Sequence, residues 1–172
     1  TSAAMGALGW MGAEWLINKK PTLLGLASGV VAGLVAITPA AGFVGLISSL
    51  IIGGVAGVLG FFSVAILKSK IGYDDSLDVF GVHGVGGFLG TILCGVFASS
   101  AFGGNQGGSD TYSIAGQVIT QCKGAGSAAI YAVIATYVIL KLVQVTIGIR
   151  VDGTAETRGL DLAEHEERGY IL

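Results

Sequence analysis

The stretch LDVFGVHGVGGFLGTILCGVF, residues 77–97, decides the fold class of this chain. Its length suits a helix that crosses the hydrocarbon core of a bilayer, which takes ~20 residues for ~30 Å. Yet it contains Asp78 and His83, and ionisable side chains are costly inside a membrane, so they mark a function by default. The stretch therefore predicts a membrane-spanning helix that carries a functional group.

The composition of the whole chain agrees with a membrane protein. Of 172 residues, 52% are hydrophobic and only 12% are charged, whereas soluble chains average roughly 25% charged residues. The 30 glycines fall inside the apolar runs, where small residues let helices approach closely. The net charge of −2 comes with no basic stripe, so a nucleic-acid partner is not expected. Cys94 and Cys122 are predicted to be free thiols.

Four further apolar segments predict four more helices in the lipid bilayer, at about 1–17, 22–41, 44–67 and 114–149. The last is too long for one perpendicular crossing and too short for two, so it predicts a single tilted helix. The chain thus divides into a transmembrane helical region, 1–150, and a polar tail, 151–172. Because the first segment starts abruptly and without a signal peptide, we expect the chain to be a fragment of a longer protein.

The basic residues predict an orientation in the plasma (inner) membrane. The connections at 42–43 and 98–113 contain no Lys or Arg. Most of the basic residues fall instead in the other connections and the tail: Lys19, Lys20, Lys68, Lys70, Arg150, Arg158 and Arg168. Since basic residues favour the cytoplasmic side, Thr1 is predicted to lie outside and the tail in the cytoplasm.

A helical wheel at ~100° per residue divides the histidine helix into two faces. Bulky residues occupy the face away from His83. The residues within about 60° of His83 are mostly small: Val79, Gly86, Gly87, Gly90 and Cys94. His83 is therefore predicted to point into the protein, either to hydrogen-bond across a helix interface or to line a path for a small polar solute or a proton.

Asp78 is predicted to play a structural part. It lies five residues from His83, which places it roughly 140° away on an ideal helix. An acid in the first turn also suits the positive end of the helix dipole, and Asp74, Asp75 and Ser76 supply N-cap chemistry. Asp78 is thus predicted to be a cap or an anchor between helix and loop.

Other motifs predict tight packing more than chemistry. Gly25, Gly29 and Gly33 recur every four residues, and Gly53 and Gly57 repeat that spacing. In the TPA sequence at 38–40, the proline is expected to end a helix, and Thr38 to bond a freed carbonyl. Glu14 is predicted to lie at the membrane interface. No metal set, phosphate loop or catalytic dyad is present, so neither an enzyme nor a cofactor is predicted.

Three stretches together resemble the ammonium transporter (Amt/Mep/Rh) family, of the bacterial Amt type: DDSLDVFGVHGVGG at 74–87, GLASGVVAGLVAITPAAGFVG at 25–45 and GLDLAEHEERGY at 159–170. The resemblance covers nearly the whole chain. It implies eleven membrane helices in two inverted halves, a homotrimer and one pore per subunit. This chain resembles the last five helices plus the tail, so it would need the N-terminal half to complete a pore.

The resemblance also assigns roles to particular residues. His83 resembles the second of two pore histidines, and Val79, Phe62 and Thr38 resemble residues along the pore. Asp78 is similar to the acid of the family's histidine motif. A set of tail residues resembles a segment that packs on cytoplasmic loops and couples subunits: Gly159, Leu160, Asp161, His165, Glu167 and Tyr170. In relatives, a PII-type signal protein can close the cytoplasmic exits.

The sequence therefore predicts passage of ammonium or ammonia through a narrow apolar pore lined by histidine. Its alternatives are an ammonium sensor that signals through the tail and a channel for another small neutral solute. A membrane-embedded hydrolase would need a facing nucleophile and base.

Overall fold

The computed structural model describes residues 1–106 and 111–167, and within those ranges the chain is helical and contains no strand. Three helical stretches there are long and apolar enough to cross a membrane: Leu46–Ile71, Phe80–Phe97 and Ile114–Thr146. A shorter apolar helix runs over Leu23–Ile37. The predicted all-α membrane class is confirmed.

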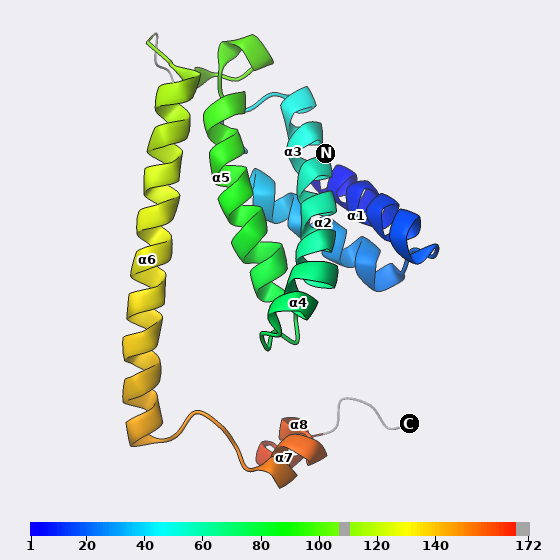
Figure 1. Ribbon diagram of the computed structural model, residues 1–172, viewed down its shortest axis with the longest axis vertical. Helices are drawn as coiled ribbons and strands as arrows, with labels where there is room; N and C mark the ends of the chain where they lie inside the picture. The colour runs from blue at the N-terminus through cyan, green and yellow to red at the C-terminus, as the bar shows by residue number, and fades with distance from the viewer. Residues whose placement is uncertain (107–110, 168–172) are drawn as a thin grey trace. The chain divides into compact units, whose positions relative to one another are not determined.

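The chain divides into two compact units, Thr1–Gly126 and Ser127–Leu172. The elements, in chain order, are α1 (Ser2–Asn18), α2 (Leu23–Ile37), α3 (Leu46–Phe62), η1 (Ser63–Lys68), α4 (Ser69–Ile71), η2 (Phe80–Gly84), α5 (Val85–Phe97), η3 (Ser100–Phe102), α6 (Ile114–Thr146), α7 (Gly153–Arg158) and α8 (Leu160–Glu164). Figure 1 labels the helices α1 to α8 along the chain. The long helix α6 begins in the first unit and continues in the second.

In the first unit, α1 packs against both α2 and α3 through glycines. A methyl group added to Gly29 of α2 would lie 2.6 Å from the carbonyl oxygen of Gly6 in α1. One added to Gly57 of α3 would overlap the same oxygen. Because no side chain separates these backbones, the predicted small-residue faces of α2 and α3 bring the helices into direct contact. We call this contact the glycine seam.

Trp10 fills the space beside the glycine seam. It is 5% exposed, and its ring meets that of Phe61 edge to face with centroids 6.1 Å apart. A methyl group on Gly60 would come within 2.8 Å of the Trp10 ring. The seam therefore makes room for the largest side chain of this core.

Helix α5 packs on α2 and α3 on another side. Gly90 touches the backbone of Ala36, where a methyl group would overlap the carbonyl. A second core surrounds that contact and includes Ile52 and Cys94. The cysteines of the described residues are both free, as predicted, with Cys94 buried and Cys122 exposed.

Local signals explain the ends of α2. At its start, Thr22 accepts the amide of Gly25 at 2.9 Å, while its hydroxyl and amide both donate to the Glu14 carboxylate. Glu14 is only 7% exposed, so its carboxylate is buried at the contact between α1 and the start of α2. At the other end α2 stops at Ile37, four residues before the predicted boundary. The Thr38 hydroxyl donates to the Leu34 carbonyl oxygen at 2.7 Å, next to the proline that cannot continue the helix.

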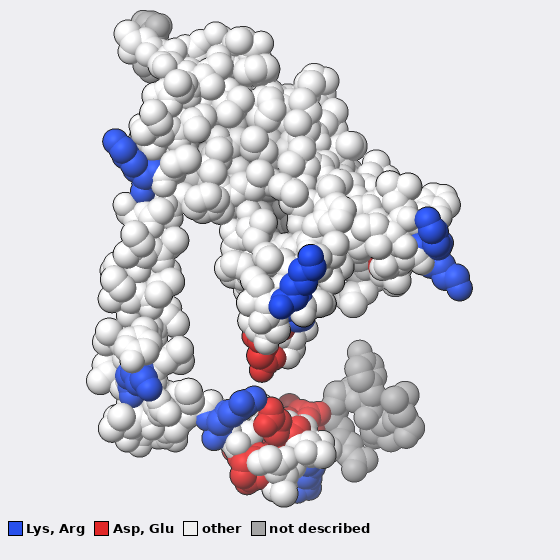
Figure 2. Space-filling model, in the orientation of Figure 1, with Lys and Arg blue, Asp and Glu red and all other residues white. Residues whose placement is uncertain are grey.

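Charged side chains are sparse over the first unit (Figure 2). Those it has lie mainly in two connections, α1–α2 and α3–α5, and comprise Lys19, Lys20, Lys68, Lys70, Asp74, Asp75 and Asp78. The surfaces of the helices outside these two connections are mainly apolar and therefore suit a membrane environment.

In the second unit, α6 ends at Thr146, three residues before the predicted boundary, and Gly148 follows with φ 80°. The tail contains the short helices α7 and α8. Asp152 caps α7 by accepting the amides of Thr154 and Ala155, and Arg150 lies 3.3 Å from Glu156. The tail is thus partly ordered by local contacts.

Candidate functional site

An open hollow on the first unit brings His83 together with Thr38. It lies between the end of α2 and the start of α5. Its lining residues are Val35, Thr38, Pro39, His83, Gly87 and Thr91. The hollow thus combines apolar walls with one imidazole and two hydroxyl groups.

Both hydroxyl groups already donate a hydrogen bond to their own helix. Thr38 donates to the Leu34 carbonyl oxygen at 2.7 Å, and Thr91 donates to that of Gly87 at 2.8 Å. Each hydroxyl oxygen keeps lone pairs that can accept a further hydrogen bond. The two threonines therefore offer acceptors to a solute that carries N–H or O–H groups.

His83 is exposed on this unit, and within the described ranges neither ring nitrogen has a hydrogen-bond partner. A neutral imidazole carries one donor and one acceptor. Both remain available to a solute or to a group from another part of the protein. Gly86 and Gly90, which share the small face predicted around His83, are buried against α2.

The backbone at His83 is not α-helical. His83 lies in η2, a π-helical turn in which the amide of Val85 bonds the carbonyl oxygen of Phe80, five residues back. Single π-helical turns inside longer helices are frequent at functional sites. The helix that carries His83 therefore contains one turn that departs from α-helical periodicity.

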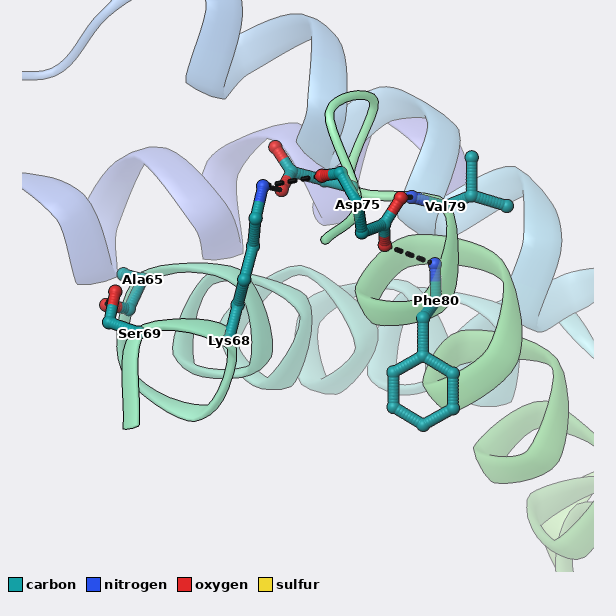
Figure 3. Close-up of polar contacts among 7 residues, drawn as sticks. Ala65, Lys68, Ser69, Asp75, Val79 and Phe80 are labelled. Carbon is teal, nitrogen blue, oxygen red and sulfur yellow. Dashed lines mark hydrogen bonds and ion pairs between the residues drawn. The ribbon is translucent and has the colours of Figure 1, made fainter. Parts of the chain in front are cut away.

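Three charged residues hold the start of η2 (Figure 3). The Asp75 carboxylate accepts the amides of Val79 at 2.9 Å and Phe80 at 2.8 Å. Lys68 donates to Asp78 at 2.7 Å and to the carbonyl oxygen of Asp75. The helix consequently begins about three residues after the predicted boundary at 77. Asp78 itself precedes the helix, with φ 57°.

Val79 and Phe62 do not line the hollow with His83. Val79 is 50% exposed beside the start of η2, and Phe62 is 38% exposed at the end of α3, with its ring 5.6 Å from that of Phe61. The α-helical wheel places Val79 on the face of His83, but Val79 is not among the residues that line this hollow. Thr91 was not predicted as a site residue. It lies about 80° from His83 on the same wheel, outside the window of about 60° that defined the face of His83.

The tail residues lie in the second unit. Gly159 has φ 94°, a conformation that suits glycine, and precedes Leu160, which is 48% exposed. The carbonyl oxygen of Asp161 accepts the amide of Glu167 at 3.0 Å, and His165 ends α8. Tyr170 lies outside the described residues.

Comparison with known proteins identifies the family. The family model described as "Ammonium Transporter Family" matches residues 1–170. The chain belongs to the ammonium transporter family. This is a family of transporters, not of enzymes. Among the residues that the structure describes, no group of three or more His, Cys, Asp or Glu side chains could hold a metal ion.

Curated ammonium transporters resemble nearly all of this chain. One from Aquifex aeolicus is 48% identical over 171 residues, which is 99% of this chain and 40% of that protein. One from Bacillus subtilis is 46% identical over 172 residues, again 99% of this chain and 42% of that protein. The chain therefore spans about two fifths of the length of these ammonium transporters.

Solved structures of the same family share the fold. The crystal structure of Saccharomyces cerevisiae Mep2 matches with a TM-score of 0.76 and 34% identity, over 89% of this chain and 36% of that one. A structure titled "Sensor Amt Protein" matches with a TM-score of 0.83 and 26% identity, over 95% and 39% of the two chains. The helices thus have the arrangement of part of an ammonium transporter.

Proposed function

We propose that this chain forms one wall of an ammonium or ammonia path through a membrane transporter, with His83 on that path. The observation that carries the proposal is the hollow lined by the His83 side chain, two threonines and apolar residues. The related proteins named as ammonium transporters support the choice of solute.

The lining of the hollow suits ammonia better than an ammonium ion. A buried charge without a partner is far more costly than a neutral polar group that makes hydrogen bonds. The oxygens of Thr38 and Thr91 can accept N–H groups, and the imidazole of His83 offers one donor and one acceptor. In this proposal ammonium loses its proton before or within the passage, and ammonia crosses as the neutral species.

The exposure of His83 supports a role beside a missing wall. The chain covers about two fifths of its relatives, and the hollow is open on this unit. We propose that the N-terminal half of the complete protein closes it. Val79 and Phe62, both exposed, would then border the path on the side of His83 nearer to the lysine-rich connections.

The same proposal places the protein in the plasma membrane of a cell. The four lysines of the α1–α2 and α3–α5 connections support a cytoplasmic position for those connections and for the tail. The family resemblance supports a homotrimer and a PII-type partner at the cytoplasmic face. Under this proposal the tail residues from Gly159 to Tyr170 contact the inner loops.

A second function, that of an ammonium sensor, is favoured by the likeness to the structure titled as a sensor protein. A sensor would bind the same solute in the same hollow but would pass on a signal through the tail. Uptake by the purified complete protein in lipid vesicles separates the two functions, because only the transporter moves the solute. A channel for another small neutral solute would show no preference for methylammonium over glycerol or urea.

The test uses the complete protein in proteoliposomes with radiolabelled methylammonium and a parallel current measurement. We expect His83→Ala to change flux at least about tenfold, since ~1.4 kcal/mol, about one hydrogen bond, corresponds to a factor of ten. Phe88→Ala, at an exposed position of the same helix, is the control. Unchanged flux and current in His83→Ala would contradict the proposal.

The threonines are tested in the same way. Thr38→Val and Thr91→Val remove the two acceptors while keeping the side-chain shape, so each should reduce the rate. Thr146→Val removes a hydroxyl that makes the same bond to the carbonyl oxygen four residues earlier, at 2.9 Å, far along α6. This control should leave the rate unchanged.

A further inference from the structure

The segment that carries His83 is held from both ends. On the N-terminal side, the Asp75 carboxylate binds the amides of Val79 and Phe80, and the Lys68 ammonium group binds Asp78 at 2.7 Å (Figure 3). On the C-terminal side, Gly90 lies against the backbone of Ala36. Neither end can shift along the helix axis without losing one of these contacts.

Between the two ends the chain holds one residue more than an α-helical turn contains. The π-helical turn η2 accommodates it, through the bond from the Val85 amide to the Phe80 carbonyl oxygen. The backbone of Asp78 is left-handed, with φ 57°, which is uncommon for a residue other than glycine and is tolerated best by Asp and Asn. The segment is therefore kept in an unusual conformation by its contacts.

Lys68 connects this turn to a second π-helical turn. It is the last residue of η1, Ser63–Lys68, and η1 packs directly on η2. A methyl group on Gly81 of η2 would lie 2.7 Å from a methyl of Val64 and 3.3 Å from the hydroxyl oxygen of Ser63, both in η1. The ion pair thus fastens the end of η1 to the start of η2, beside a contact that leaves no free space.

The ion pair is partly shielded from its surroundings, with both side chains 28% exposed. Removing Lys68 would leave the Asp78 carboxylate without its ion-pair partner at the edge of an apolar unit. The contact is also short and directional, because the same ammonium group reaches the carbonyl oxygen of Asp75 as well. These features suit a group that fixes geometry.

We propose that Lys68 and Asp78 are positioning residues for His83, acting by holding the π-helical turn η2 between its two ends. Without the pair, the extra residue can move into the 72–78 connection and η2 can relax toward an α-helix. Side chains in and before the turn then rotate, and the imidazole no longer lines the hollow together with Thr38. The consequence for transport rests on the proposed function of His83, whereas the consequence for the direction of the ring does not.

The test uses the complete protein with ¹⁵N-labelled histidine. The imidazole signal of His83 is assigned by its loss in His83→Gln. Lys68→Met and Asp78→Asn each remove one charge, and Asn keeps the left-handed backbone accessible. Lys70→Met removes a neighbouring exposed lysine and is the matched control. The folding of every variant is checked by its elution as an intact oligomer.

We expect Lys68→Met and Asp78→Asn to shift the His83 signal and to lower the maximal rate of methylammonium uptake. The fall should be roughly 10- to 100-fold, the usual effect of a misplaced functional group, with KM changed less than the rate. Lys70→Met should change neither measurement.

Two results overturn the proposal. One is a His83 signal that stays in place in both folded single variants, whatever the uptake rate. The other is a Lys70→Met variant that shifts the signal as much as Lys68→Met does. A shifted signal with unchanged uptake upholds the positioning role and instead contradicts the proposed role of His83 in transport.

Discussion

Helices α1 and α6 occupy opposite extremes of packing. The 17 residues of α1 include six that are buried, and its backbone touches two other helices. The 33 residues of α6, all of them described, include none that is buried. Both are mainly apolar, so hydrophobicity alone does not distinguish them. The difference shows that α1 is packed within this chain, whereas α6 keeps a largely exposed surface although its residue Val118 lies against Gly95 of α5.

The largest effect is expected when a side chain is introduced into the glycine seam, because this tests the close packing of α1 directly. Gly57→Leu would drive a side chain into the backbone of Gly6, which cannot move aside as a side chain could. We expect a loss of about 4 kcal/mol or more in the free energy of unfolding, in the exceptional range for one substitution. Yield of the folded complete protein and its thermal unfolding in detergent measure this loss.

The control for that variant lies on α1 itself. Gly12→Leu adds the same side chain at a position with nothing described within 4 Å, so stability should be nearly unchanged. Gly124 of α6 also has no described atom within 4 Å of an added methyl group. The variant Gly124→Leu therefore tests whether α6 is packed against another part of the complete protein. A destabilised Gly124→Leu protein would show that α6 packs tightly in the complete transporter.

The next largest effect is expected at the aromatic core beside the seam. Trp10→Ala removes a ring that is 5% exposed and in contact with Phe61, at a cost of about 3–5 kcal/mol. Trp15→Ala removes a ring that is 60% exposed and should change stability by less than about 1 kcal/mol. Equal effects of the two substitutions on the unfolding temperature would contradict the orientation of α1, in which Trp10 is buried and Trp15 is exposed.

A smaller effect tests the hydrogen bonds between α1 and α2. Glu14→Ala leaves the amide and the hydroxyl of Thr22 without their acceptor, which should lower the free energy of unfolding by about 1–3 kcal/mol. Glu14→Gln keeps one carbonyl oxygen and should lose less. Thermal unfolding of the two variants side by side gives the comparison, and a Gln variant less stable than the Ala variant would refute it.

The smallest effect is expected in the tail, where stabilisation is local. The Thr154 hydroxyl, together with the amides of Ala155 and Thr154, lowers the pKa of Asp152. Because the pKa in the folded tail lies below the ordinary value of about 3.9, the capping contribution is present above that value. It is lost as the pH falls through the lowered pKa.

Amide exchange at Thr154 and Ala155, corrected for intrinsic rates, should therefore show loss of protection only in acid. Asp152→Asn should keep a cap without this pH dependence, since Asn also caps helices well. Asp152→Ala should lose the protection at every pH. Identical exchange in all three proteins would show that the cap does not order α7.

Much of the fold could be predicted from the sequence, because apolar runs and glycine spacing report burial in a membrane directly. The order of the helices and the contact faces at Gly29 and Gly57 follow from those patterns. The ends of helices were less predictable, since they depend on single polar contacts. Asp75, for example, delays the start of the histidine helix by binding two amides of the next turn.

The candidate site was predictable only in part. His83 stands out as an ionisable residue in an apolar helix, and Thr38 stands out beside a proline, so both could be named in advance. The π-turns could not, because their sequences are as apolar as the α-helices that they interrupt. The pairing of Lys68 with Asp78 could not be predicted either, because it requires a fold that brings residues ten apart together.

The short sequence separation between Glu14 and Thr22 has a consequence for how the protein enters the membrane during synthesis. A carboxylate in an apolar segment opposes insertion until its oxygens find donors. Here both donors come from a residue only eight positions later, so they emerge from the ribosome almost together with the acid. The α1–α2 hairpin can therefore satisfy its acid before α3 leaves the ribosome, and α3 can then dock onto a finished pair.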